Sequence, residues 1–495
     1  MQIPESLKKV LVYLYEHNAQ GIVVGGAVRD TLLGREIKDF DIEVYGINKI
    51  DLLEKMLSRF GRVDLVGKSF GILKVTVEGD TYDFSFPREE RKVAPGHKGF
   101  EVSIGSKMDF VEAAKRRDFT INAMGYDPIS EQLYDPFGGR EDLKRGILRH
   151  IDSARFAEDP LRVYRAVQFA ARFGMDVAEE TATLCKEMVA EGMLDELPKE
   201  RIYEEWKKLL LQSHRPSVGL ELMRAWGITD RYFPELHALI DVPQDPNWHP
   251  EGDVWVHTMM VIDAMAGIIG GEQAVNSMEQ GVGSRGEKER LGLMFAALCH
   301  DFGKPITTTI EYEDGKVEEW HEPNGSVASK IRAIGHEKAG LEPTQSFLYR
   351  LTNEHDFIES ILPLVEHHLK PSQFYAQAAK AGAIRRLALR VNIKELVEVA
   401  KADFLGRTTV EAKGRHYEAG EWLLAEAQKL QVEESSMPPL LQGRDLIALG
   451  LKPSPRFGEI LSTVYEAQMD GRFVTREDAV SYAEKIIAFT HKQKV

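Results

Sequence analysis

The segment VVGGAVRDTLLGREIKDFDIEVYG, residues 23–46, constrains the fold more than any other part of the chain. An apolar run ends at Gly25 and Gly26, a helix-like stretch follows, and a second β-branched run begins near Asp41. Strand, glycine turn, helix and strand in succession predict an α/β layer whose backbone N–H groups a ligand can approach closely at the turn. A helix that starts at such a turn favours anions, phosphate included.

Several carboxylates accompany this turn. Asp39 and Asp41 alternate on the second strand, so both side chains are expected on one face. Neighbouring carboxylates repel unless a cation lies between them, and hard oxygen ligands suit Mg²⁺. Asp83, in the strand-like TYDFSF, is a candidate third carboxylate, and Arg29 is a candidate phosphate contact. A phosphate-binding turn beside a carboxylate metal site is suited to nucleotidyl transfer, although a lone Asp-x-Asp pair is most often solvated surface.

The fold class follows from a change in pattern along the chain. With 495 residues, the chain is too long for a single core. Residues 1–150 alternate strand-like and helix-like segments, whereas the pattern beyond about residue 155 is almost wholly helical. We therefore predict an α+β protein, with a small mixed-sheet head and a long all-α body. The predicted domains are residues 1–150, 151–235, 236–432 and 433–495, and the glycine-rich segment 267–290 is expected to be an exposed loop.

Composition restricts the setting and the partners. Cys185 and Cys299 are the only cysteines, too few for a disulfide framework, which fits a reducing cytoplasm. We find no apolar run long enough to span a membrane, and the first residues lack the layout of a signal peptide. We therefore expect a cytoplasmic protein without a membrane partner, and no obligatory protein partner is evident. The net charge of −15 disfavours nucleic acid unless basic side chains gather on one face.

Two further motifs follow the strand-like segments, KRRDFTINAMGYDP and FAEDPLRVYRAVQFAARFG. In the second motif Asp159, Arg162 and Arg165 recur at helical spacing and share one face, opposite an apolar stripe. Such a face is normally solvated. An Asp and an Arg one turn apart can also match donors and acceptors on the Watson–Crick edge of a base.

Together, GGAVRDTLLG…KDFDIEVYG, RRDFTINAM, EDPLRVYRAVQFAARFG and LPKERIYEEWKKLL resemble the class II tRNA nucleotidyltransferases. These are the CCA-adding enzymes, their CC-adding and A-adding relatives, and bacterial poly(A) polymerases. The resemblance implies a nucleotidyltransferase head with a polymerase β-like palm, followed by a neck that reads the base and binds RNA. It implies template-independent addition of C and A to the 3′ end of tRNA, with CTP, ATP and Mg²⁺. The basic pairs at residues 144–145 and 385–386 are candidate phosphate contacts.

The same resemblance implies roles for individual residues. Asp39 and Asp41 would hold two Mg²⁺ ions, with Asp83 as a further catalytic carboxylate. Asp159 and Arg162 would select C or A. Many family members carry an arginine where this chain has Gln168, so the resemblance does not carry a phosphate or base contact over to this position. The nucleotide-binding set is Gly25, Gly26, Arg29, Arg117, Asp159, Arg162 and Arg165.

The body carries a second series of metal-ligand residue types. An adjacent His and Asp at the end of an apolar helix offer one nitrogen and one oxygen to a divalent ion. The histidines and aspartates of the body occur in an order that resembles that of the HD phosphohydrolase superfamily. This resemblance implies an HD domain at 236–432 with a divalent metal of unknown identity. The implied core ligands are His257, His300, Asp301 and Asp403, completed by His336 and by one of His367 and His368. His355-Asp356 lacks the apolar helix and is expected on the surface.

Several alternatives remain open at the level of sequence. The enzyme could add only A or only CC, or could make poly(A), because the switch from C to A depends in this family partly on a head segment, here 86–105. The HD domain could instead be the working part, with the head as a tRNA-binding module. A non-catalytic RNA-binding protein is a third class. The insertion-like segment 306–330 has two strand-like pieces, and the tail is either a tRNA-binding segment or a capping helical pair.

Overall fold

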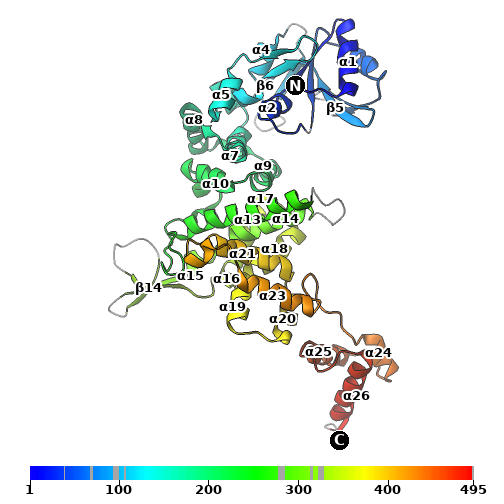
Figure 1. Cartoon of the computed structure of the whole chain (residues 1–495), viewed down its shortest axis with the longest axis vertical. Coiled ribbons are helices and arrows are strands. Elements are labelled where there is room, and N and C mark those ends of the chain that lie inside the picture. Colours follow the sequence, from blue (N-terminus) through cyan, green and yellow to red (C-terminus); the bar gives the residue numbers. More distant parts are fainter. Residues whose placement is uncertain are drawn as a thin grey trace. The chain divides into compact units, whose positions relative to one another are not determined.

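The structure is a computed structural model that describes residues 1–37, 39–66, 71–92, 100–104, 108–276, 285–312, 316–320 and 328–492. The chain divides into two compact units, Met1–Tyr232 and Phe233–Val495. Strands dominate the N-terminal part of the first unit, and helices dominate the second (Figure 1). The predicted fold class, a mixed-sheet head followed by a predominantly helical body, is confirmed.

The head is built on one mixed sheet. Its described strands number seven, in the order β3-β4-β5-β2-β1-β8-β9. β2 and β5 run parallel, and every other neighbouring pair is antiparallel. A separate antiparallel pair is formed by β6 and β7. The strands are β1 (Gln20–Val24), β2 (Asp41–Tyr45), β3 (Arg62–Val66), β4 (Ile72–Val77), β5 (Asp80–Ser85), β6 (Arg88–Lys92), β7 (Phe100–Ile104), β8 (Gly125–Asp127) and β9 (Gln132–Tyr134).

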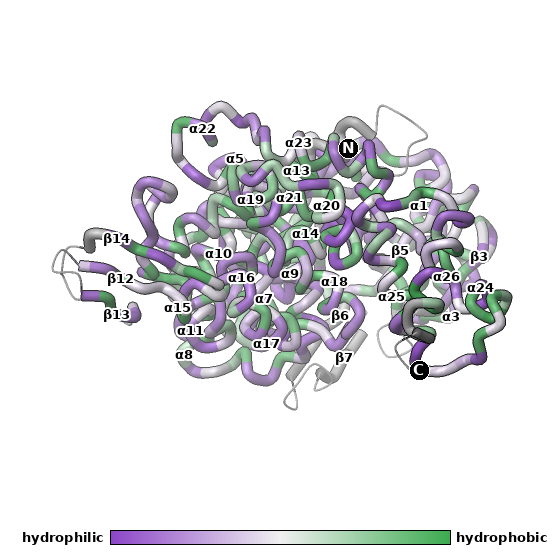
Figure 2. Tube along the Cα trace, turned by 90° about the horizontal axis from the view of Figure 1, so that it is seen from below, coloured by the Kyte–Doolittle hydropathy of each residue, from purple (hydrophilic) through white to green (hydrophobic). Residues whose placement is uncertain are grey.

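The elements of the head follow from side-chain periodicity. In β4, Leu73, Val75 and Val77 are buried at alternate positions, as expected of a strand with one face on the core. In α1 (Glu5–Glu16) the buried apolar residues recur at helical spacing, which places them on one face. Figure 2 shows hydrophobic residues interleaved with hydrophilic ones along most segments, as amphipathic elements require.

The remaining elements of the first unit are mostly helical. Short strands β10 (Ile147–Leu148) and β11 (Asp176–Val177) form a parallel pair. The helices are α2 (Gly26–Leu32), α3 (Ile50–Leu57), α4 (Phe110–Ala114), η1 (Thr120–Asn122), α5 (Gly139–Arg145), α6 (Ser153–Ala157), α7 (Leu161–Phe173), α8 (Glu179–Ala190), η2 (Met193–Glu196), α9 (Lys199–Gln212), α10 (Pro216–Ala225) and α11 (Ile228–Tyr232).

The second unit is helical apart from one small sheet. β12 (Thr308–Tyr312) lies between β13 (Val317–Glu319) and β14 (Ala328–Ala333), all antiparallel. The body is therefore not all-α as predicted, because the insertion-like segment 306–330 contributes strands to this sheet. The two strand-like pieces in its sequence had indicated them. The helices up to the tail are α12 (Pro234–His237), α13 (Val254–Asn276), α14 (Glu287–Cys299), α15 (Lys304–Thr307), α16 (His336–Ala339), α17 (Leu341–Leu351), α18 (His355–His367), α19 (Lys370–Ala376), α20 (Ala381–Ala388), α21 (Ile393–Leu405), α22 (Val410–Lys413) and α23 (Glu418–Lys429).

The glycine-rich segment does not begin as a loop. Helix α13 continues through Gly267, Gly270 and Gly271 to Asn276, which corrects the prediction of a loop over 267–290. The helix buries a long apolar face that includes Ile269, and this burial outweighs the low helix propensity of glycine. Residues 277–284 lie outside the described part of the chain.

The C-terminal tail has its own hydrophobic cluster. Helices α24 (Gly443–Ala448), α25 (Arg456–Met469) and α26 (Arg476–Lys492) pack around buried residues that include Leu446, Ile460 and Val464. Arg385 of α20 donates to the carbonyl of Met469 at 2.8 Å, and its neighbour Arg386 pairs with Glu466 and Asp470. This basic pair therefore holds the tail, which weakens its interpretation as a phosphate contact. Lys144 and Arg145 at the end of α5 are exposed and stay candidates.

The predicted division into four domains stays a prediction. The boundary between the two compact units, at residue 232, falls close to the predicted boundary at 235. Within the described residues, no helix combines the length and apolar character needed to cross a membrane.

We predict that Leu446→Ala loosens the tail without affecting the head. Leu446 is fully buried in the tail cluster, and removing such a side chain costs about 2–5 kcal/mol. Hydrogen–deuterium exchange should therefore speed up across α24–α26 and stay unchanged in β1 and β2. The control is Ile447→Ala, because the side chain of Ile447 is 54% exposed. Equal exchange in both variants would contradict a self-contained tail core.

Candidate functional site

The glycine turn of the head lies against an arginine. β1 ends at Val24 and α2 begins at Gly26, in the predicted order. Gly25 has φ of +70°, and its N–H donates to the carbonyl of Met124 at 3.2 Å. A Cβ at Gly25 would lie 2.9 Å from Nη1 of Arg117. Glycine at this position thus satisfies the backbone conformation and makes room for the guanidinium.

The three predicted carboxylates of the head gather at one place. Asp41 is the first residue of β2 and pairs in register with Asp83 of the parallel strand β5. Asp39 precedes Asp41 by two residues, with the buried ring of Phe40 between them, and both carboxylates are exposed. Strand alternation therefore places Asp39 and Asp41 on the same side, next to Asp83.

The electrostatics of this group call for positive charge. Partial desolvation raises the pKa of Asp41, and the nearby charges of Asp83 and Asp39 add to the effect while Arg117 opposes it. Oδ1 of Asp83 is shielded from solvent and accepts no hydrogen bond from the described residues, with Nζ of Lys74 at 3.6 Å. Crowded carboxylates, one of them with a shielded oxygen that accepts no hydrogen bond from the described residues, fit a divalent cation that prefers oxygen ligands.

A buried glutamate supports the site and was missed by the sequence analysis. Glu43 lies two residues beyond Asp41 on β2 and is 1% exposed. Its carboxylate accepts hydrogen bonds from Arg116 at 2.7 Å, from Arg117 at 2.9 Å and from the hydroxyl of Tyr45 at 2.8 Å. Burial alone would raise the pKa of Glu43, but the two guanidinium groups hold it below its ordinary value. The sequence DFDIE could have revealed this residue, because Glu43 continues the alternation of Asp39 and Asp41.

Arg29, a predicted phosphate contact, lies in a buried network. Its side chain donates from Nε to Asp30 at 2.8 Å and from Nη1 to Oδ1 of Asn122 at 2.7 Å, and its guanidinium lies 4.6 Å from the ring centroid of Phe173. Burial lowers the pKa of Arg29 despite the opposing effect of Asp30. In this structure Arg29 braces α2, so a contact with phosphate requires some of these bonds to be exchanged.

Asp159 precedes helix α7 rather than lying within it. Pro160, which has no N–H to donate, separates α6 from α7, and α7 begins at Leu161. The carboxylate of Asp159 accepts from Nη1 and Nη2 of Arg201 on α9, at 3.2 and 3.0 Å, and from the N–H of Leu161 at 3.3 Å. This bidentate pair fixes the orientation of the carboxylate.

Arg162 and Arg165 lie on successive turns of α7. Arg162 donates to two backbone carbonyls, that of Arg155 at 2.7 Å and that of Arg116 at 2.6 Å. Arg165 donates to the buried carboxylate of Asp118 at 2.7 Å. Arg162 is thus bound to a backbone carbonyl of the RRDF motif, and Arg165 is bound to a side chain of the same motif.

Of the head segment 86–105, which was expected to influence base choice, residues 93–99 and 105 lie outside the described residues.

The metal-ligand residues predicted in the body converge. His257 lies in the first turn of α13, and His300 and Asp301 directly follow α14. His336 is the first residue of α16, and Asp403 lies near the end of α21. Nε2 of His257 lies 3.1 Å from Oδ1 of Asp403, and Nε2 of His300 lies 3.1 Å from Oδ2 of Asp301. Nε2 of His336 lies 3.3 Å from Oδ1 of Asp301. We call these residues, with His368, the HD cluster.

Hydrogen bonds fix the tautomers of the cluster histidines. Three of them donate from Nδ1 to the carbonyl three residues earlier: His300 to Ala297 at 2.8 Å, His336 to Ala333 at 2.7 Å and His368 to Val365 at 2.7 Å. In a neutral ring Nε2 then carries a lone pair, yet Nε2 of His336 and of His368 lie 3.3 Å apart. Facing lone pairs repel unless a proton or a metal ion lies between them.

The HD cluster therefore fits a divalent metal. Nε2 of His300 is buried and has no hydrogen-bond partner among the described residues, as expected of an atom kept for an ion. Burial lowers the pKa of His368 to about 3, so the ring is neutral and able to coordinate. Burial alone would raise the pKa of Asp301, but His300 and Lys304 hold it well below its ordinary value. Mixed nitrogen and oxygen ligands suit divalent transition metals.

His367 and His368 differ in their surroundings. His368 lies in the HD cluster, grouped with Asp301 and His336, whereas the nearest carboxylate oxygen to Nε2 of His367 belongs to Glu366, at 3.8 Å. His355 is exposed, as predicted for its His-Asp dipeptide. In the sequence alone, two adjacent histidines at a helix end were indistinguishable.

Two basic side chains adjoin the cluster and were not predicted. Nζ of Lys304 lies 2.7 Å from Oδ2 of Asp301 and donates to Oε1 of Gln244 at 2.5 Å. Arg407 pairs with Asp403 at 2.8 Å. Both follow the acidic partner by one helical turn, which was the available signal. A cavity of about 320 Å³ opens beside these residues, and β14 contributes part of its wall.

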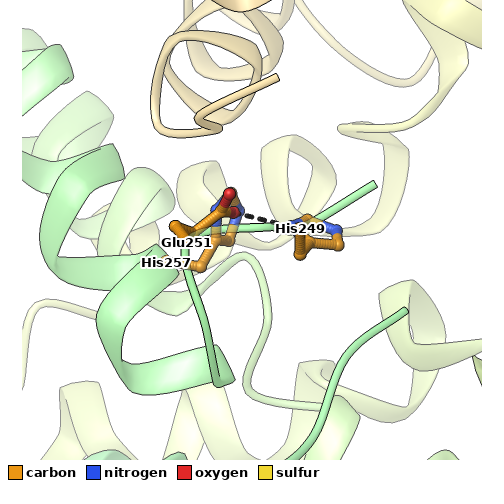
Figure 3. A group of neighbouring side chains, drawn as sticks. All are labelled: His249, Glu251 and His257. Carbon is orange, nitrogen blue, oxygen red and sulfur yellow. Dashed lines mark hydrogen bonds and ion pairs between the residues drawn. The ribbon is translucent and has the colours of Figure 1, made fainter. Parts of the chain in front are cut away.

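A second buried glutamate orients His257. Oε1 of Glu251 accepts from Nδ1 of His257 at 2.8 Å and from Nδ1 of His249 at 2.9 Å (Figure 3). Its Oε2 accepts from the N–H of Thr408 at 3.0 Å, just beyond Arg407. Glu251 thus joins the segment before α13 to the end of α21, which carries Asp403. Its position gave no periodic signal in the sequence.

Three known protein families match successive parts of the chain. A family model described as the poly A polymerase head domain matches residues 22–149. A model described as the probable RNA and SrmB-binding site of polymerase A matches residues 174–240, and an HD domain model matches residues 254–407. These matches define a nucleotidyltransferase head joined to an HD domain, two domain types that imply dependence on divalent metal.

Curated relatives cover most of the chain. A multifunctional CCA protein of Nitrosospira multiformis is 37% identical over 78% of this chain and 83% of the relative. One from Xanthomonas campestris is 33% identical over 89% of this chain and 96% of the relative. The chain belongs to the family of multifunctional CCA proteins, which confirms the tRNA nucleotidyltransferase family predicted from its motifs.

Solved structures show the same fold. The CCA-adding enzyme of Bacillus stearothermophilus in complex with CTP aligns with a TM-score of 0.64 at 19% identity, over 99% of this chain and 100% of that one. The Thermotoga maritima CCA-adding enzyme complexed with tRNA aligns with a TM-score of 0.58 at 20% identity, over 98% and 96%. At these identities the likeness concerns the fold.

We predict that Glu251→Gln weakens metal binding in the HD cluster. A glutamine keeps the shape, but its NH₂ group must face either the histidine N–H groups or the N–H of Thr408, so one donor loses its acceptor. Loss of such an outer partner typically costs 10–100-fold in metal affinity. Chelator competition with Mn²⁺ or Co²⁺ measures the affinity.

The matched control is Glu235→Gln, which changes a glutamate that pairs with Arg350 and Ser346 and with no residue of the cluster. We expect this control to bind metal as the unaltered chain does. Equal affinity in Glu251→Gln and Glu235→Gln would show that Glu251 does not position His257.

Proposed function

We propose that this chain adds C and A to the 3′ end of tRNA from CTP and ATP, without a nucleic-acid template, and that its HD cluster hydrolyses phosphoesters. The observation that carries the first part is the register of Asp41 with Asp83, beside Asp39 and the Gly25 turn. Family membership supports the same activity. We place this work in the cytoplasm, with tRNA as the partner.

In the head, Asp39, Asp41 and Asp83 would hold Mg²⁺, which supplies activation of the primer hydroxyl and neutralises charge on the triphosphate. The reaction joins the primer 3′ oxygen to the α-phosphorus, releases pyrophosphate and frees the hydroxyl proton. The chain's own contribution is placement. Glu43 holds Arg117 against Gly25, where its charge can meet a phosphate without an intervening side chain.

Base selection would fall to Asp159 and Arg162. Both side chains are held by the protein, Asp159 by Arg201 and Arg162 by two backbone carbonyls. A guanidinium has five N–H donors and a carboxylate about four acceptor sites, so each retains capacity for a base edge. A protein template of this kind needs fixed side chains, because mobile ones would accept either base. Arg165 would support this arrangement from the next turn.

In the HD cluster, His257, His300, Asp301 and Asp403 would hold a divalent ion, with His336 and His368 completing the site. Such an ion supplies Lewis-acid polarisation of a phosphoryl oxygen and an activated water. The protein contributes the imidazoles and two positive side chains: Lys304 and Arg407 offset the two buried aspartates and favour an anion in the adjoining cavity.

The domain roles belong to the same proposal. Residues 1–150 form the nucleotidyltransferase head, 151–235 the base-reading and RNA-binding neck, 236–432 the HD domain and 433–495 the tail. Restricted addition of A or CC, or poly(A) synthesis, would use the same head residues. It differs from full CCA addition in which nucleotide each primer accepts.

The proposal predicts that the two activities separate by mutation. Asp41→Ala should lower nucleotide addition to tRNA by roughly 10³-fold or more, because it removes a metal ligand worth several kcal/mol in the transition state. It should leave hydrolysis of a 2′,3′-cyclic phosphodiester unchanged. His300→Ala should do the reverse. Both reactions are measured on the same preparations. Addition retained in Asp41→Ala refutes the carboxylate site, and hydrolysis retained in His300→Ala refutes the HD cluster.

A second prediction concerns base choice. Arg162→Ala should reduce the preference between CTP and ATP by roughly 5- to 100-fold, the range expected for one bidentate base contact. The comparison is Arg165→Ala, one helical turn beyond Arg162. This change breaks the ion pair with Asp118 and should lower the rate of addition from CTP and from ATP by similar factors. The ratio of kcat/KM values for CTP and ATP on one tRNA primer measures the effect. An unchanged ratio in Arg162→Ala would remove the base-reading role.

A further inference from the structure

One aromatic side chain near the HD cluster is unusually open to solvent. Trp248 is 64% exposed, more than any other aromatic side chain in the described part of the chain. Large aromatic side chains bury much apolar area when they pack, so leaving one in water forgoes that stabilisation. Trp206 and Trp255 are fully buried, as is usual. An exposed tryptophan beside a cavity is therefore a candidate contact for a ligand.

The backbone that carries Trp248 is firmly held. The N–H groups of Trp248 and His249 both donate to the carbonyl of Asp245, at 3.0 and 2.9 Å. The side chain of Asp245 accepts from the N–H of Asn247 at 2.9 Å, which closes the turn. The ring is therefore presented by an ordered turn.

This turn is attached to the HD cluster on both sides. Before it, Gln244 accepts from Nζ of Lys304, which lies against Asp301. After it, His249 donates to Glu251, the glutamate that orients His257 (Figure 3). Trp248 therefore has a fixed position relative to the cluster.

Trp248 and the cluster line one cavity of about 320 Å³, within the range of small-molecule sites. Its inner residues include Lys304 and Arg407, whose positive charges suit a phosphate, beside the metal-ligand candidates Asp301 and Asp403. Arg332 on β14 lines the same cavity and is 48% exposed, with Glu311 at 4.0 Å, the outer limit of an ion pair. The cavity thus combines an anion-binding interior, a cationic wall and an aromatic face.

We propose that Trp248 is a base-stacking platform, which holds the base of a nucleoside phosphate in the HD cavity while the phosphate lies against Lys304. Base stacking on an aromatic ring contributes about 1–3 kcal/mol and tolerates any base, because every base has a π-face. The site is therefore selective for nucleosides but indifferent to which base they carry. Arg332 attracts the ligand through charge and makes no distinction between nucleosides and other phosphoesters.

This inference rests on the proposed hydrolase activity of the HD cluster. The reaction is hydrolysis of a cyclic phosphodiester: the oxygen of water bonds to phosphorus, one P–O bond to the ribose breaks, and the departing oxygen takes a proton. The product is a phosphomonoester, and no oxidant or second substrate is required.

The test compares two substrates on the full-length protein. Adenosine 2′,3′-cyclic phosphate carries a base, and glycerol 1,2-cyclic phosphate carries the same reacting group without one. We expect Trp248→Ala to lower the ratio of their kcat/KM values by roughly 5- to 100-fold, and Trp248→Phe to restore much of it. Arg332→Ala should lower both values by similar factors. Tyr349→Ala changes an exposed aromatic side chain outside the cavity lining and should leave the ratio unchanged.

Binding supplies a readout independent of turnover. Adenosine 2′-monophosphate should quench tryptophan fluorescence in the unaltered protein, and this quenching should be largely lost in Trp248→Phe. A ratio and a binding constant unaffected by Trp248→Ala would overturn the stacking role. Absence of hydrolysis of both substrates by the unaltered protein would instead overturn the proposed hydrolase, while quenching would still report on Trp248.

Discussion

Carboxylates crowded together must be neutralised, and both candidate sites are arranged around that requirement. In the head, Asp41 and Asp83 stand in register on adjacent strands with Asp39 beside them. In the body, Asp301 and Asp403 are buried, with Nε2 of His300 3.1 Å from Asp301 and Nε2 of His257 3.1 Å from Asp403. Buried charges such as those of Asp301 and Asp403 are strongly destabilising when they are left unpaired. Arg117 in the head, and Lys304 and Arg407 in the body, offset part of this charge.

Two buried glutamates have parallel roles in the two units. Glu43 holds Arg116 and Arg117 beside the carboxylates of the head, and Glu251 orients His257 in the HD cluster. Each glutamate has an almost fully buried side chain that accepts at least three hydrogen bonds. Supporting residues of this type keep charged side chains in fixed orientations, which both base selection and metal binding require.

Sequence reasoning succeeded where the signal is local. The glycine turn, the strand carrying Asp41 and the apolar helix before His300 each follow from periodicity within a short window, and the structure has them as predicted.

Sequence reasoning failed where contacts join segments that are far apart in the chain. Glu251 meets Thr408 across more than a hundred residues, and no spacing rule connects them. The burial of Arg29 depends on Asn122 and Phe173, which come from other elements. Helix α13 continues through a glycine-rich stretch because tertiary burial overrides helix propensity there. Such features follow from packing, which a single sequence does not reveal.

The most direct test of the central claim is addition to defined primers. The purified chain is incubated with Mg²⁺ and three tRNA transcripts that end before CCA, after the first C and after CC, with CTP and ATP supplied separately and together. The account predicts that every transcript is completed to CCA, with C added only at the two C positions and A only after CC. No addition to any transcript would contradict it, and A added only to the CC-ended transcript, or CC added without A, would reduce the activity to a restricted one.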